Sequence, residues 1–194
     1  MPSLLFRHLR TAPNVLSLSR IVLVLASALL FSAGWRGLGI AVGVVGAVTD
    51  TFDGALARAT GQVTRLGEIL DQFGDLCFES TMILVAVVQG FLPAAVLVIY
   101  LFREFWVGGI RRFMAGEGLN IPSSPWGKLK TNLLMWGLLP SFLAIMEWPP
   151  AAAPALATVG RVMIALGLVA SYVSGLGYTR AFVAGYGRAA AKSG

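Results

Sequence analysis

The chain has 194 residues, of which 57% are hydrophobic and only 12% are charged. Soluble domains carry charge on about a quarter of their residues, so this composition excludes an ordinary soluble domain and favours an integral membrane protein. The net charge is +6, but the bases are scattered between apolar segments, which argues against nucleic acid as a partner. A single cysteine and a single histidine exclude an internal disulfide and a Cys/His metal cluster.

Six apolar segments have about the 20 residues that a helix needs to cross a bilayer. They cover residues 16–34, 37–58, 67–91, 93–113, 129–147 and 152–178. Residues 1–15 mix arginines with apolar residues, and we expect them to form a short amphipathic helix on the membrane surface. The sequences FLP and EWPP predict turns between neighbouring spans. The expected fold is all-α, with six transmembrane helices in a single domain over 1–194.

The distribution of bases predicts the orientation in the membrane. Six spans place both termini on one side, and nearly all of the lysines and arginines outside the spans flank that side. The opposite loops hold a single base, Arg36. Since bases accumulate in cytoplasmic loops, we expect an integral protein of the cytoplasmic membrane with both termini in the cytoplasm.

Two aspartates end the second span, near the cytoplasmic side. Asp50 and Asp53 are followed by Gly54, Ala57 and Arg58, at separations of 3, 1, 3 and 1. Residues three and four apart lie on the same face of a helix, so these five residues are expected to share one face.

The third span begins with a matching pattern. Gly67, Asp71 and Asp75 follow one another at intervals of four and share a helical face. Because the two spans are antiparallel neighbours joined by a short loop, we expect the two acidic faces to meet. Four carboxylates at such short range repel one another, and oxygen ligands without Cys or His suit Mg²⁺ or Mn²⁺. Two such cations fit four aspartates.

Helix packing and ion transport account for this pattern less well. Small residues alone are typical of helix packing in membranes, but packing does not explain the aspartates. Intramembrane carboxylates also occur in cation transporters. Here all four lie at one end, and the outer halves of the spans hold no acids that would continue an ion path.

The stretch from Asp50 to Asp75 reads D-x2-D-G-x2-A-R-x8-G-x3-D-x3-D. This pattern resembles the signature of the CDP-alcohol phosphatidyltransferases, integral membrane enzymes of phospholipid synthesis, and all eight positions are present. The resemblance implies transfer of a phosphatidyl group from CDP-diacylglycerol to the hydroxyl of a polar acceptor, with release of CMP. It also implies that the metal ligands are Asp50, Asp53, Asp71 and Asp75. Asp75 would also be the general base. The CDP group would be received by Gly54, Ala57, Arg58 and Gly67.

Two further segments, 13–21 and 103–131, resemble the phosphatidylglycerophosphate synthase branch of this family, whose acceptor is sn-glycerol 3-phosphate. The bases that could bind the acceptor phosphate are Arg103, Arg111, Arg112, Lys128 and Lys130. All of these except Arg103 are equally well explained as cytoplasmic anchoring residues. We expect Arg103 to pair with Glu104, and Glu79 to hydrogen-bond between helices.

One departure leaves the acceptor open. The last two aspartates of that branch usually stand in D-P-x-x-D-K, whereas this chain has DQFGDL. Phosphatidylglycerol (giving cardiolipin), inositol phosphate and serine therefore remain alternative acceptors. The resemblance also implies a homodimer.

Overall fold

The computed structural model describes residues 12–60, 65–118 and 124–193, although the side chains of 50–66, 68 and 187–193 and of a few residues before 17 lie outside the description. Within these ranges the chain is all-helical, as predicted. The elements are α2 (Ala12–Ser32), α3 (Arg36–Thr60), α4 (Arg65–Val88), α5 (Ala94–Gly116), α6 (Pro125–Ile145), the short 3₁₀ helix η1 (Pro150–Ala152) and α7 (Ala153–Ser193). The expected interfacial helix over 1–15 falls mostly outside the described residues.

The helix ends follow from local sequence. Gly34 and Gly90, which end α2 and α4, have φ angles of 85° and 73°, a left-handed conformation that glycine adopts without a steric penalty. Ser124 caps α6: its Oγ accepts a hydrogen bond from the Gly127 N–H at 3.0 Å, and Pro125 occupies the first turn. The turns predicted from FLP and EWPP are present.

The last helix differs from the prediction. The apolar segment over 152–178 predicts a span that ends there, but α7 continues to Ser193. Hydropathy decides where a helix can contact lipid, whereas alanine-rich sequence favours helix in any surroundings. The segment after residue 178 is less apolar but contains several alanines, so the helix outlasts the apolar segment.

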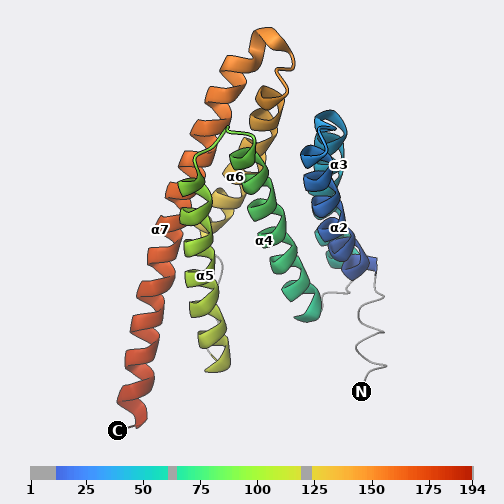
Figure 1. Ribbon diagram of the computed structural model, residues 1–194. Coiled ribbons are helices and arrows are strands. Elements are labelled where there is room, and N and C mark those ends of the chain that lie inside the picture. The colour runs from blue at the N-terminus through green and yellow to red at the C-terminus, as the bar shows by residue number, and fades with distance from the viewer. Residues whose placement is uncertain (1–11, 61–64, 119–123, 194) are drawn as a thin grey trace.

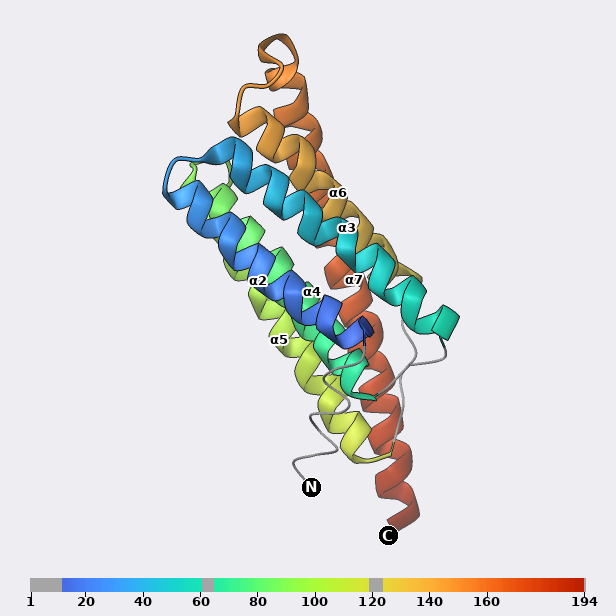
Figure 2. The ribbon, with the colours of Figure 1, turned by 90° about the vertical axis from the view of Figure 1, so that its right-hand side faces the viewer.

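The helices form an elongated bundle in which consecutive helices run antiparallel (Figures 1 and 2). The most extensive packing joins α6 to α7 and α2 to α3. Helix α2 also packs against α4, and α4 in turn contacts α5 and α6. In the described part of the chain, direct packing of α3 on α4 is slight by comparison. The helix that lies against both signature helices is therefore α2.

Glycines allow α6 and α7 to approach closely. A Cβ atom built on Gly160 of α7 would lie 3.1 Å from the carbonyl oxygen of Gly137 and 3.0 Å from the backbone nitrogen of Ser141, both on α6. Backbone atoms cannot move aside as the end of a side chain can. The α6–α7 contact therefore requires a residue without a side chain at position 160.

Substituting Gly160→Ala is expected to destabilise the fold by about 1–3 kcal/mol, the usual cost of overpacking a close contact. Gly177→Ala is the matched control, because it lies on the same helix and its Cβ would meet nothing within 4 Å. Thermal unfolding of the two variants in detergent measures the difference. Equal melting temperatures would show that the helices are not so closely packed at Gly160.

Two features of the side-chain distribution are unusual for a soluble protein: several charged residues are buried, and many large apolar side chains are exposed. Arg20, Glu79, Arg103 and Lys130 are all at most 7% exposed. Large apolar side chains point outward on every helix, among them Val22, Leu29, Phe102, Val162 and Val169. By length and composition, one helix of the described part, Pro150–Tyr186, can cross a membrane, and Ser17–Ser32 and Arg36–Thr49 are shorter apolar helices. Six spans are thus not established by this criterion.

Candidate active site

The first half of the predicted site lies on α3. Asp50, Asp53, Gly54, Ala57 and Arg58 all fall within this continuous helix, so the spacing that assigns them to one face applies. Their side chains lie outside the described residues, and their contacts stay a prediction.

The second half lies on α4. Gly67, Asp71 and Asp75 fall within this helix, one turn apart from one another. The side chains of Asp71 and Asp75 are 51% and 37% exposed, so both carboxylates are accessible to a ligand. The acidic stripe on α4 is therefore formed as predicted, at the end of the helix where α4 follows α3.

An arginine that the sequence did not single out contacts both of these aspartates. Arg20, on α2, donates from Nη1 to Oδ1 of Asp75 at 2.9 Å and from Nη2 to Oδ1 of Asp71 at 3.2 Å. Nη2 also reaches the backbone oxygen of Asp71 at 3.2 Å. Arg20 is only 1% exposed. In the sequence it is one of many bases near the cytoplasmic face, although it lies in the segment 13–21 that resembles the phosphatidylglycerophosphate synthase branch.

The metal hypothesis rests on the donor set. Among the described side chains no group of three Asp, Glu, His or Cys residues could hold a metal ion. Asp71 and Asp75 supply two of the four predicted ligands, and the other two are outside the described side chains. Carboxylate oxygens without nitrogen or sulfur ligands fit Mg²⁺ or Mn²⁺, so the residues present are compatible with such a cation.

A buried network of charges lies deeper in the bundle. The ammonium of Lys130 is 2.7 Å from Oε2 of Glu79 and 3.1 Å from Oε1 of Glu104. Tyr100 donates its hydroxyl to Oε2 of Glu79 at 2.6 Å. Arg103 contacts Oε1 of Glu104, also at 2.6 Å. The two bases and two acids therefore neutralise one another, as buried charges must.

This network confirms two predictions from the sequence. Glu104 pairs with Arg103, and Glu79 bonds across helices, to Tyr100 on α5 and Lys130 on α6. Glu79 lies one turn after Asp75 on α4, so the charge network begins one helical turn away from the acidic stripe.

The five bases predicted to bind the acceptor have different surroundings. Arg103 and Lys130 are buried and paired with glutamates. Arg111 is partly buried and lies over the ring of Tyr178 at 5.8 Å, whereas Arg112 and Lys128 are exposed. The last three have no carboxylate partner in the ion pairs of the described residues, so their charge is the more accessible.

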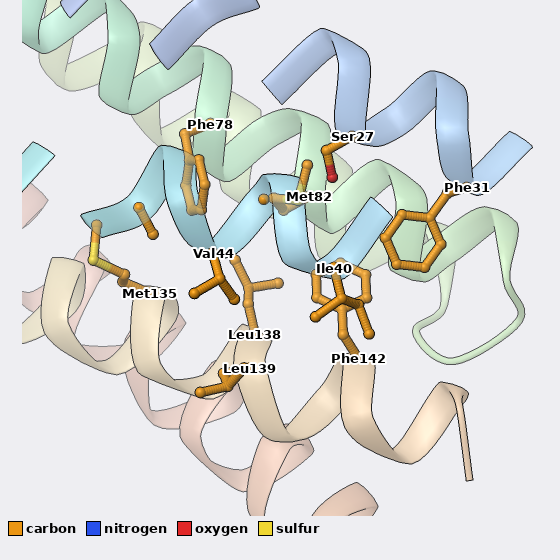
Figure 3. Close-up of a pocket in the computed structure, with 12 residues that line it drawn as sticks. Ser27, Phe31, Ile40, Val44, Phe78, Met82, Met135, Leu138, Leu139 and Phe142 are labelled. Atoms are coloured by element: carbon orange, nitrogen blue, oxygen red, sulfur yellow. The ribbon is translucent and has the colours of Figure 1, made fainter. Parts of the chain in front are cut away.

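A small apolar cavity lies between four helices of the bundle (Figure 3). Its volume is about 50 Å³, and its wall is built by α2, α3, α4 and α6. Phe78 and Met82 line it from α4, Val44 from α3 and Leu138 from α6. Phe78 is the lining residue of α4 nearest to the acidic stripe, one turn after Asp75, whereas Phe31 and Phe142 line the cavity near the far ends of α2 and α6. A ligand pocket usually has about 300–1,000 Å³, so this cavity is too small and too apolar to hold a nucleotide.

Comparisons with known proteins agree with the sequence signature. The family model for CDP-alcohol phosphatidyltransferase matches residues 10–181. A Rickettsia typhi protein named CDP-diacylglycerol–glycerol-3-phosphate 3-phosphatidyltransferase is 32% identical over 67% of this chain and 75% of its own length. A Bacillus subtilis protein of the same name is 29% identical over 61% of this chain and 69% of its own. A Mycobacterium tuberculosis protein, whose name refers to cardiolipin synthase, is 32% identical over 70% of this chain and 66% of its own.

Proposed function

Because the chain belongs to the CDP-alcohol phosphatidyltransferase family, we propose that it transfers a phosphatidyl group from CDP-diacylglycerol to sn-glycerol 3-phosphate. The chain is thus a CDP-diacylglycerol-dependent phosphatidyltransferase. The observation that carries the proposal is the eight-position signature, which lies on two consecutive helices, α3 and α4. The products would be phosphatidylglycerophosphate and CMP.

In the proposed reaction the acceptor hydroxyl oxygen forms a bond to the β-phosphorus of CDP-diacylglycerol. The bond from that phosphorus to the oxygen of CMP breaks, and the hydroxyl proton passes to the carboxylate of Asp75. Arg58 would pair with a phosphate of the CDP group, while Gly54, Ala57 and Gly67 leave room for it. A carboxylate that binds a metal is a weak base, so proton transfer alone contributes little. The site must therefore also hold the acceptor hydroxyl close to the phosphorus.

Two divalent cations, Mg²⁺ or Mn²⁺, would be held by Asp50, Asp53, Asp71 and Asp75. When bound, they neutralise the pyrophosphate and the charge that develops on CMP. The accessible carboxylates of Asp71 and Asp75 support this assignment.

For the acceptor phosphate we propose the bases Arg103, Arg111, Arg112, Lys128 and Lys130. The accessible charges of Arg111, Arg112 and Lys128 support a first contact with a phosphate dianion. Arg103 and Lys130 are held by Glu104 and Glu79, so they would bind the acceptor only by sharing their hydrogen bonds with it.

We further propose that the chain is a single domain of six membrane spans with its termini and active site on the cytoplasmic side. The outward apolar side chains and inward charges described above support burial in lipid. The charges that keep α4 and α5 from qualifying as spans by composition include Glu79 and Arg103, which face the bundle interior. We expect a homodimer, as the family resemblance implies.

Cardiolipin synthesis is the second candidate. The sequence DQFGDL departs from the usual D-P-x-x-D-K, and the Mycobacterium tuberculosis relative carries a cardiolipin synthase name. The two reactions share their chemistry and differ in the acceptor, which is phosphatidylglycerol for cardiolipin.

The test is an acceptor panel with the purified protein. CDP-diacylglycerol and Mg²⁺ would be supplied with glycerol 3-phosphate, phosphatidylglycerol, inositol phosphate or serine, and CMP release would be measured. We expect release with glycerol 3-phosphate. Release with phosphatidylglycerol alone would assign the second candidate, and no release with any acceptor would contradict the phosphatidyltransferase assignment.

A further inference from the structure

We propose that Arg20 is a positioning residue, which holds the carboxylates of Asp71 and Asp75 side by side in the orientation that binds the catalytic cations. This inference rests on the proposed function, because it assumes that these two aspartates are metal ligands. The family signature runs from Asp50 to Asp75 and does not include Arg20, which lies on a different helix.

The geometry of the guanidinium supports the proposal. Its two terminal nitrogens each donate to a different carboxylate, in both cases to Oδ1. A guanidinium is planar and rigid, so it fixes the distance and the relative orientation of the two groups that it bonds. The backbone oxygen of Asp71 binds the same nitrogen and anchors the guanidinium to α4 itself.

Burial distinguishes Arg20 from a surface ion pair. The arginine side chain is 1% exposed, whereas the side chains of Asp71 and Asp75 are 51% and 37% exposed. The guanidinium of Arg20 therefore contacts the two carboxylates from the interior of the bundle. The exposed sides of the carboxylates face away from Arg20. An exposed ion pair would contribute little, but a buried arginine that leaves its carboxylates loses the compensation for its desolvation.

Gly74 provides the space that Arg20 occupies. A Cβ atom at position 74 would lie 2.6 Å from Nη2 and 3.2 Å from Cζ of Arg20. Gly74 stands between the two aspartates on α4, and its lack of a side chain lets the guanidinium approach the helix closely at this point. Any side chain here would push the guanidinium away from the carboxylates.

The chemical consequence concerns the cation site. Groups that hydrogen-bond to metal ligands fix the orientation of those ligands, and their loss typically costs about 10- to 100-fold in metal affinity or activity. Arg20 would also offset part of the repulsion among the aspartates before any cation binds. Its removal should therefore weaken cation binding even though all four aspartates remain.

The experiment measures Mn²⁺ binding to the purified protein by electron paramagnetic resonance, independently of turnover. We expect Arg20→Gln to weaken Mn²⁺ binding by about 10- to 100-fold. Arg20→Lys should also weaken it, because one ammonium cannot reproduce the two-point contact. Gly74→Ala, which keeps every charge, should weaken it as well. High Mn²⁺ should restore CMP release by Arg20→Lys toward the wild-type rate.

Two matched controls are available. Arg161→Gln removes another arginine from the bundle, one whose Nε lies 3.4 Å from the carbonyl of Phe91, far from the aspartates in sequence and on α7. Gly109→Ala repeats the glycine substitution in α5, where a Cβ would meet nothing within 4 Å. Both controls should bind Mn²⁺ as the wild type does.

Wild-type Mn²⁺ affinity in a folded Arg20→Gln variant would overturn the proposal. If that variant fails to fold, Gly74→Ala decides, and wild-type affinity in Gly74→Ala would overturn the proposal equally. Failure of the wild-type protein itself to bind Mn²⁺ would instead reject the proposed metal site, and this inference with it.

Discussion

Replacing Asp71 or Asp75 by Asn is expected to lower kcat by about a thousandfold or more, while the protein stays folded. A metal ion contributes several kcal/mol to stabilisation of the transition state, and each 1.36 kcal/mol is worth about tenfold in rate. Asparagine is nearly the same size but lacks the negative charge that a divalent cation needs. The measurement is CMP release from CDP-diacylglycerol, at saturating Mg²⁺ and acceptor, with the melting temperature taken in parallel.

The control for these variants is Glu147→Gln. It makes the same change from carboxylate to amide in the exposed turn after α6, which lies at the opposite end of the bundle from the start of α4 (Figure 1). We expect this variant to keep wild-type turnover. Near-normal activity in the Asn variants would mean that the stripe on α4 does not hold the catalytic cations.

Replacing Lys130 by Met is expected to destabilise the protein by about 3–5 kcal/mol, the usual cost of removing one partner of a buried ion pair. Methionine has a similar length and fills the space of the lysine stem. Its loss of charge leaves Glu79, which is 2% exposed, without a cation. Glu104 loses less, because it keeps Arg103. The free energy of unfolding in detergent would be compared with that of the wild type.

Two further variants decide whether the buried charge causes this effect. Lys128→Met makes the same substitution two residues away at an exposed position, and it should change stability little. The double variant Glu79→Gln with Lys130→Met removes the orphaned charge and should recover part of the loss. Equal destabilisation by Lys128→Met, or no recovery in the double variant, would contradict the network.

Most of the helical architecture could be predicted from the sequence, because apolar segments separated by Gly and Pro turns define where helices begin and end. The exception is α7, because the predicted apolar segment ends near Tyr178 while the helix continues to Ser193. The acidic stripe on α4 follows from spacing alone, as helical geometry requires.

What spacing could not predict is which helix packs beside the stripe. The short loop between the second and third spans suggested α3 as the partner of α4, but α2 packs against both. Arg20 is 51 residues away from Asp71 in the chain. The sequence shows that Arg20 is charged but not in which direction its side chain extends. Near the cytoplasmic end of a span, an arginine can extend toward the lipid headgroups or turn inward.

The same limit applies to Lys130. Its charge and cytoplasmic position fit a phosphate-binding residue, and that role stays a prediction. Its partners Glu79 and Glu104 lie on two other helices, so only the three-dimensional packing reveals the pairing. Local patterns predict faces of helices, whereas contacts between distant faces depend on how the helices pack.

The most direct test of the proposed two-metal site is a crystal structure of the protein grown with Mn²⁺, with the cations located by anomalous scattering. We predict anomalous peaks between α3 and α4, about 2 Å from carboxylate oxygens contributed by both helices, including Asp50 or Asp53 and Asp71 or Asp75. An absence of peaks there, or acidic stripes that face separate regions of the bundle, would contradict this site.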